Sequence, residues 1–257
     1  MYALSLYGLL PVYAYVWAVK ASGDFSCKSF YTTFPSGSVS NTGSDSLFKA
    51  LSPQETYETG DNGLVMYLLK PEGTIKTTGN VNDKLGKGAT INSTEVFVHG
   101  KVSFEVSAPT VAGVVTAVIL VGSDSLDEID VELLGGDPDH WSTNVFVFLP
   151  GETEPMYGKY ASTERVSDSG GSIAQKHTYS IDYDPGRIVW SIDDRVVRTL
   201  TKEQADERYP THRVRIQFGI WDASGEEGTS EWARGPIDWS KQHEKIPAHI
   251  HSMTLEC

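Results

Sequence analysis

The chain has 257 residues, a length that suits one large β-sandwich or barrel. Lys and Arg number 21 and Asp and Glu number 34, so the formal net charge is −13. Nucleic acids and anionic membranes attract basic surfaces, and the charge therefore excludes both as expected partners. The two cysteines cannot build a zinc cluster without several histidines nearby, so we expect no bound metal.

The N-terminal segment resembles a secretory signal peptide. Residues 1–19 carry no charged side chain, and small residues follow, with Val19 and Ala21 placed for cleavage before Ser22. We expect residues 1–21 to be a signal peptide and residues 22–257 to form one domain. This start lacks the usual Lys or Arg, so a signal anchor or a first core strand stays open. A cleaved signal would give a secreted protein with no stable membrane insertion of the mature chain.

Cys27 and Cys257 bracket nearly the whole remaining chain. In a secreted protein we expect them to form a disulfide that ties the first ordered segment to the last strand, whereas a cytosolic protein would keep two free thiols. Asn92, followed by Ser93 and Thr94, forms the only Asn-x-Ser/Thr sequon and is a candidate glycosylation site.

Segments rich in β-branched and aromatic residues recur between turn clusters. Many alternate apolar with polar residues, as a strand buried on one face does. Because no βα alternation is present, we predict an all-β sandwich of two antiparallel sheets. One short helix is expected at 201–208, with Thr201 as its cap. The predicted strands span residues 63–70, 95–107, 113–121, 127–134, 144–149, 178–183, 187–192, 195–200, 213–221 and 250–256.

The most informative motif is DEIDVE at residues 127–132. On a strand, alternate residues share one face, so Glu128, Asp130 and Glu132 would line up while Ile129 and Val131 point into the core. Three adjacent like charges repel one another and should raise at least one pKa. No structural need explains that cost. The alternatives are an acidic, solvated strand face and a calcium site built from oxygen ligands.

Paired carboxylates favour glycoside cleavage. A retaining glycosidase holds its nucleophile and its acid/base carboxyl about 5–5.5 Å apart. The Cα atoms of Glu128 and Glu132 would lie about 13 Å apart on an ideal strand, so their side chains must lean together. Asp130 can hydrogen-bond the nucleophile, and its charge helps to keep the acid/base protonated. A general acid of ordinary pKa, about 4.3, would be mostly ionised at neutral pH, so an acidic optimum is expected.

The motif resembles the ExDxE signature of glycoside hydrolase family 16, in its form without a bulge. By this resemblance Glu128 is the nucleophile, Asp130 assists it and Glu132 is the general acid/base. Within the family, the chain looks like the fungal Crh-type cell-wall transglycosylases over about residues 90–257. The blocks that carry the likeness are residues 100–137, Thr143-Asn144, HTYSIDYDPGRIVWSIDDRVVRT at 177–199 and GTSEWARGPIDW at 228–239.

The resemblance implies a concanavalin A-like jelly-roll sandwich with a concave substrate cleft. The enzymes that it resembles cut chitin and re-attach it to β-glucan, without a cofactor. Trp221 and Trp232 are candidates for the floor of such a cleft, and Asn144 for a polar contact; for each Trp, core packing is the alternative. Trp190 and Trp239 are assigned to the core. We expect a monomer that is secreted or held in the cell wall.

The chain departs from the Crh-type pattern at two positions. It has Val131 where many such proteins carry an aromatic residue, and Arg234 where a small residue is usual; we expect both near the cleft. An endo-β-1,3(4)-glucanase is the alternative enzyme, although its motif more often carries an extra residue. A non-catalytic carbohydrate-binding sandwich is the alternative from another class. Gly86-Lys87-Gly88 is too short for a phosphate-binding loop.

Overall fold

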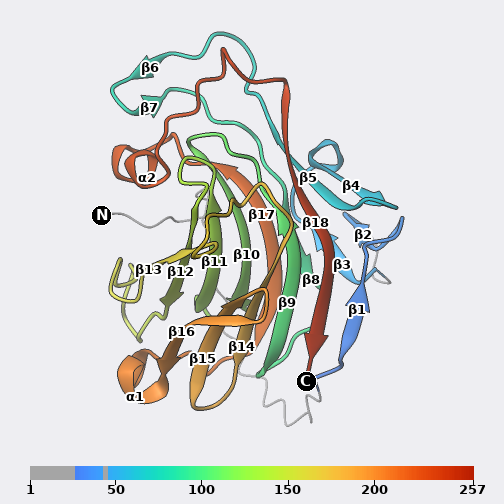
Figure 1. Cartoon of the computed structure of the whole chain (residues 1–257), viewed down its shortest axis with the longest axis vertical. Coiled ribbons are helices and arrows are strands. Elements are labelled where there is room, and N and C mark those ends of the chain that lie inside the picture. The colour runs from blue at the N-terminus through green and yellow to red at the C-terminus, as the bar shows by residue number, and fades with distance from the viewer. Residues whose placement is uncertain (1–26, 43–45) are drawn as a thin grey trace.

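Two β-sheets pack against each other over residues 27–42 and 46–257, the residues that the computed structural model describes (Figure 1). The predicted signal peptide at 1–21 lies outside them. Sheet I contains, in spatial order, β16 (Arg195–Thr201), β15 (Arg187–Ile192), β14 (His177–Tyr183), β9 (Gly100–Ser107), β18 (Lys245–Glu256), β5 (Gly63–Leu69) and β4 (Tyr57–Gly60), with β1 (Phe30–Thr32) beside β18. Sheet II contains β13 (Ser162–Arg165), β12 (His140–Phe146), β11 (Glu128–Leu134), β10 (Val114–Gly122), β17 (Val214–Asp222), β8 (Thr90–Ser93), β3 (Phe48–Ala50) and β2 (Val39–Ser40).

Neighbouring strands run antiparallel, except that β2 and β3 are parallel. A small hairpin of β6 (Thr77–Thr78) and β7 (Val81–Asn82) stands apart from both sheets. The sequence-based prediction of a sandwich of two antiparallel sheets is therefore confirmed, apart from the short parallel pair of β2 and β3.

Helices are short and few among the described residues. The helix predicted at 201–208 is confirmed as α1 (Lys202–Ala205) followed by the 3-10 helix η2 (Asp206–Arg208). Thr201 caps it as predicted, because its hydroxyl accepts from the Gln204 N–H while the Gln204 side chain accepts from the Thr201 N–H. The others are the 3-10 helix η1 (Gln54–Thr56) and α2 (Glu227–Trp232). Within the described ranges, no helix has the length and apolar composition that crossing a bilayer requires.

An aromatic cluster joins the two sheets. Phe104 of sheet I packs edge-on against Phe218 of sheet II, which also contacts Phe34 and Phe48, with ring centroids 5.2–5.7 Å apart within the cluster. All four side chains are fully buried. Aromatic pairs of this geometry contribute about 0.5–1.5 kcal/mol each beyond their burial. The cluster therefore helps to hold the two sheets together, while β17 is held beside β10 by the pairing of the two strands.

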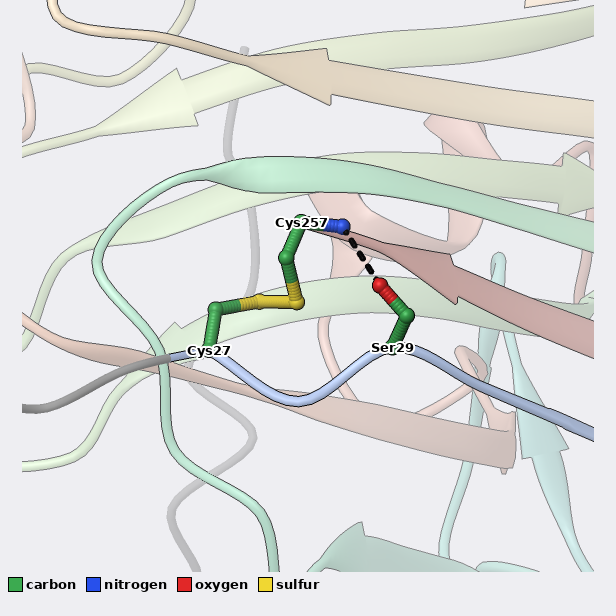
Figure 2. Close-up of a disulfide and its surroundings, with 3 residues drawn as sticks. All are labelled: Cys27, Ser29 and Cys257. Atoms are coloured by element: carbon green, nitrogen blue, oxygen red, sulfur yellow. Dashed lines mark hydrogen bonds between the residues drawn. A yellow bond between two sulfur atoms is a disulfide. The ribbon is translucent and has the colours of Figure 1, made fainter.

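Cys27 and Cys257 form the predicted disulfide, with their Cα atoms 5.5 Å apart (Figure 2). The backbone N–H of Cys257 also donates to the Ser29 hydroxyl at 3.0 Å, as Figure 2 shows. The bond ties the segment before β1 to the end of β18, as expected for a secreted protein, and the alternative of two free thiols is not what the structure has.

Most predicted strands are confirmed to within one or two residues, but three differ more. The strand predicted at 250–256 is the second part of β18, which starts earlier, at Lys245. The strand predicted at 144–149 is β12, which starts earlier, at His140, and ends at Phe146. The start of this strand was missed because Ser142, Thr143 and Asn144 are polar and break the apolar pattern. Ser142 and Asn144 lie opposite Glu132 and Asp130. The strand predicted at 95–107 begins only at Gly100, and β8 precedes it as a separate strand that the sequence analysis did not predict.

Candidate active site

The three acidic residues of DEIDVE share one face of β11, as predicted. Ile129 and Val131 are fully buried in the core between the sheets, so the alternate residues Glu128, Asp130 and Glu132 point to the other side of sheet II. We call this side the open face. The alternation confirms the strand and its orientation; the catalytic roles of the three carboxyls stay a prediction.

The neighbouring strands hold β11 in an unbroken register. On β12, Phe146 lies opposite Glu128, Asn144 opposite Asp130 and Ser142 opposite Glu132. Paired residues of antiparallel strands project to the same side, so these three β12 side chains also lie on the open face. No bulge interrupts the pairing between Glu128 and Glu132, in agreement with the ExDxE form of the motif.

On the other flank of β11, small and aliphatic side chains line the open face. Ala117 of β10 lies opposite Glu132, and Val121 lies opposite Glu128. Beyond β10, Gly219 of β17 pairs with Ala117. The residues beside Glu132 on this flank are therefore the smallest ones, Ala117 and Gly219.

Sheet I contacts β11 across the core between the sheets. The indole Nε1 of Trp190, on β15, donates to the backbone carbonyl of Asp130 at 3.0 Å across the core. Trp190 is fully buried and Trp239 nearly so, which confirms the assignment of both to the core. The Asp130 side chain is also buried, and its Oδ1 has no hydrogen-bond partner among the described residues. Such an unsatisfied buried oxygen is costly for the fold and is typical of functional sites.

Burial raises the pKa of all three carboxyls, and repulsion adds to the rise for Asp130 and Glu132. Burial raises the pKa of Glu128 to about 7. Burial and then the charge of Glu128 raise the pKa of Glu132 to about 8. The pKa of Asp130 rises well above its ordinary value, mainly through burial and then through the charges of Glu128 and Glu132. Near neutral pH the cluster therefore holds fewer charges than three, and Glu132 keeps its proton longer than Glu128.

Trp221 and Trp232 lie together at one end of the open face. Their rings stack at 6.1 Å with an interplanar angle of 11°, and both pack against Val115, Ala223 and Ala233. Val115 pairs with Trp221 on one side and with Leu134, two residues beyond Glu132, on the other. This cluster is separate from the main core, so both indoles belong to the open face rather than to the packing between the sheets.

The two departures from the Crh-type pattern fall in different environments. Val131 is fully buried and points into the core, so the expectation that it lies near the cleft was wrong: odd-numbered residues of this strand face inward. Arg234 is exposed at the far end of β11, where its guanidinium lies 3.7 Å from the Asp137 carboxylate. Its φ of 57° is left-handed, a conformation that favours glycine.

Asn92 lies on β8, opposite Gln217 of β17. Its side-chain oxygen accepts from the Gln217 amide at 2.8 Å, and the residue is half-buried. Gln217 shares the open face with Trp221, so Asn92 does too. Its glycosylation stays a prediction; a glycan there would occupy part of this face.

Two residues beside the carboxyls escaped the sequence analysis. Phe146 pairs with Glu128, and the alternation of Ser142, Asn144 and Phe146 could have placed it there. The ring of Tyr157 packs edge-on against Phe146 at 6.1 Å. It lies in an irregular segment, where no periodicity gives a signal.

Comparison with known proteins agrees with this geometry. The family model described as "Glycosyl hydrolases family 16" matches residues 46–241. Crh-like protein 2 from Aspergillus fumigatus is 34% identical over 183 residues, which cover 66% of this chain and 40% of that protein. The present chain thus spans two fifths of the length of this relative.

Among solved structures, the Crh5 transglycosylase in complex with NAG superposes with a TM-score of 0.69 at 28% identity, covering 89% of this chain and 83% of that one. The Bacillus licheniformis β-glucanase superposes with a TM-score of 0.65 at 19% identity over 89% of this chain and 98% of that one. The second likeness shows the fold alone, and it confirms the predicted jelly-roll sandwich. The chain therefore belongs to family 16 of the glycosyl hydrolases, enzymes that act on glycosyl bonds.

Proposed function

We propose that the chain is a retaining transglycosylase of cell-wall polysaccharide, which cleaves chitin and transfers the released segment to β-glucan. The observation that carries this proposal is the row of Glu128, Asp130 and Glu132 on the open face of one regular strand. A retaining reaction needs two carboxyls of unequal acidity within reach of one glycosidic bond. The pKa of Glu132, raised to about 8, and that of Glu128, raised to about 7, supply this inequality.

In this proposal Glu128 is the nucleophile. Its carboxylate attacks the anomeric carbon while Glu132 protonates the leaving oxygen, and a covalent glycosyl-enzyme forms. Glu132, now ionised, then takes a proton from the incoming hydroxyl, which displaces Glu128. Asp130 lies between them on the same face, and its raised pKa favours the protonated carboxyl, which can donate a hydrogen bond to Glu128 and orient it.

The choice of substrate rests on the relatives. One solved relative is described as a transglycosylase in complex with NAG, the sugar unit of chitin. Trp221 and Trp232 offer flat apolar surfaces for the faces of sugar rings, and Asn144 offers a polar contact beside Asp130. We accordingly propose secretion to, or retention in, the cell wall, and action as a monomer.

The test uses a chitin oligosaccharide as donor and a fluorescently labelled β-1,3-glucan oligosaccharide as acceptor, with products followed by mass spectrometry. Labelled hybrids longer than the acceptor would support transfer. Shortened donor without hybrids would indicate a hydrolase and direct the search to other β-glucans, including an endo-β-1,3(4)-glucanase activity. Binding of either sugar without any product would indicate a carbohydrate-binding module.

Variants assign the two roles separately. Glu128→Ala and Glu132→Ala should both lose turnover, and azide should rescue each with opposite stereochemistry. Azide replaces the nucleophile in Glu128→Ala and gives an α-glycosyl azide, whereas in Glu132→Ala it attacks the glycosyl-enzyme and gives the β-azide. Glu105→Gln is the matched control, because Glu105 is a strand glutamate of sheet I. The same azide product from both variants would overturn the assignment.

A further inference from the structure

The segment that joins β12 to β13 runs over residues 147–161 and contains no helix or strand. Ordered connections of this length are uncommon in compact domains and usually serve a function. It begins directly after Phe146, the residue opposite Glu128. The segment therefore starts beside the residue that pairs with the candidate nucleophile.

Side chains from the α1–η2 region hold the first half of this segment in place. The buried guanidinium of Arg208 donates to the Val147 carbonyl at 2.9 Å and to Glu152 Oε2 at 2.8 Å, and its second amino group donates to Glu152 Oε1. Glu152 Oε2 also accepts from the Leu149 N–H at 2.9 Å. A two-pronged contact between Arg and carboxylate fixes direction as well as distance.

The second half is held in the same way. Arg198 Nη2 donates to the Tyr160 carbonyl at 2.5 Å, and the buried Tyr160 hydroxyl donates to the Ala205 carbonyl at 3.0 Å. Both ends of the segment are thus anchored, and the residues between them, 153–158, have a defined place. Tyr157 lies in this central part.

Tyr157 packs against the residue that lies opposite the candidate nucleophile. Its ring meets Phe146 at 6.1 Å with an interplanar angle of 71°, and Phe146 shares the open face with Glu128. Burial raises the pKa of Tyr157, and so do the negative charges of Glu154, Glu226 and Glu128. The phenol is therefore within electrostatic reach of carboxylates from three separate segments and keeps its proton, so that it can donate a hydrogen bond.

We propose that Tyr157 is a substrate-binding residue, whose phenol donates a hydrogen bond to the sugar unit that lies over Glu128. The inference rests on the proposed function, since it takes the open face as the polysaccharide site. Sugar hydroxyl and acetamido oxygens are suitable acceptors. The anchored segment would hold the phenol in place before the sugar arrives, so little conformational freedom is lost on binding.

The experiment compares Tyr157→Phe, which keeps the ring against Phe146, with Tyr157→Ala, which removes it. Tyr31→Phe is the matched control, because Tyr31 is 64% exposed on β1. With chitin oligosaccharide, Tyr157→Phe should raise KM about three- to tenfold, the worth of one hydrogen bond, with kcat within about twofold of wild type. Tyr157→Ala should raise KM by tenfold or more. The melting temperature of Tyr157→Phe should match that of the control.

Wild-type turnover in the same assay tests the proposed function, so the two failures are distinguishable. A KM for Tyr157→Phe within about twofold of wild type would overturn the inference and leave the proposed function standing. Calorimetric titration of the same oligosaccharide is run in parallel. If wild type binds without cleaving, weaker binding by Tyr157→Phe supports the inference and equal binding overturns it. If wild type neither binds nor cleaves, both proposals fail.

Discussion

Glu132→Gln removes the carboxyl whose pKa is raised to about 8 by burial and by the charge of Glu128. Glutamine has the same shape but does not ionise. Between pH 4.5 and 8 the unfolded chain releases this proton while the folded protein keeps it, so the folded state binds more protons. Stability therefore falls as pH rises through this window. The variant escapes that loss, and its free energy of unfolding should exceed that of wild type at alkaline pH.

The structure also gives the magnitude. The rise in pKa from 4.5 to about 8 corresponds to roughly 5 kcal/mol, at about 1.4 kcal/mol for each tenfold change in proton affinity. This is an upper value, because part of the rise comes from the charge of Glu128 and the two carboxyls share the effect. We expect a gain of about 2–5 kcal/mol at pH 8.5 and less than about 1 kcal/mol at pH 4.5. Turnover should be lost at both pH values.

The assay is urea unfolding followed by tryptophan fluorescence at the two pH values. Glu105→Gln is again the control: it breaks only a partly exposed ion pair with Lys176, worth less than about 1 kcal/mol at either pH. Equal stability of Glu132→Gln and wild type at pH 8.5, or a gain of the same size at pH 4.5, would refute the reasoning. Either result would mean that Glu132 ionises in the folded protein as freely as it does in the unfolded chain.

Three further predictions concern the site and its framework. The pH profile of kcat/KM should be bell-shaped, because activity rises as Glu128 loses its proton near pH 7 and falls as Glu132 loses its proton near pH 8. This optimum lies above the acidic one expected from a carboxyl of ordinary pKa. A flat rate from pH 5 to 9 would contradict the prediction. Replacing both cysteines of the disulfide by serine should lower the free energy of unfolding by about 5 kcal/mol, the chain-entropy value for a sequence separation of 230. Equal alkylation of the wild-type protein before and after reduction would show that the bond is absent. Gly88→Ala should cost more than about 3 kcal/mol in urea unfolding, because its Cβ would lie 1.7 Å from the Ile220 carbonyl oxygen. Gly186→Ala should cost little, because its Cβ would lie 3.5 Å from Asp184 Oδ1, an ordinary contact. Similar losses for both would be evidence against the close approach at Gly88.

The carboxylate row was predictable because strand alternation is a strong local signal. Ile129 and Val131 specify which side of β11 is buried, so the place of Glu128, Asp130 and Glu132 follows from sequence. The disulfide was predictable for a different reason: with two cysteines, only one pairing exists within the chain. The stacking of Trp221 on Trp232 was not, since a ring contact between a strand and a helix depends on how the chain turns between them.

The surroundings of Glu128 were the least accessible to sequence reasoning. Tyr157 reaches its place through Arg208 and Arg198, residues 51 and 41 positions further along the chain, and no local pattern encodes such contacts. For Gly86-Lys87-Gly88 the sequence showed a motif but not the reason for its glycines. The structural reason for these glycines is the close passage of the segment against the end of β17.

The bond between Cys27 and Cys257 closes the chain from residue 27 to residue 257 into a covalent ring. One cut by a protease in an exposed loop would open this ring without dividing the molecule, so the pieces would migrate together on a gel until a reductant is added. Strand pairing would hold the cut ends close in the meantime. A protein exposed to foreign proteases could thus keep its sheets, and the carboxylates on them, through a first cleavage.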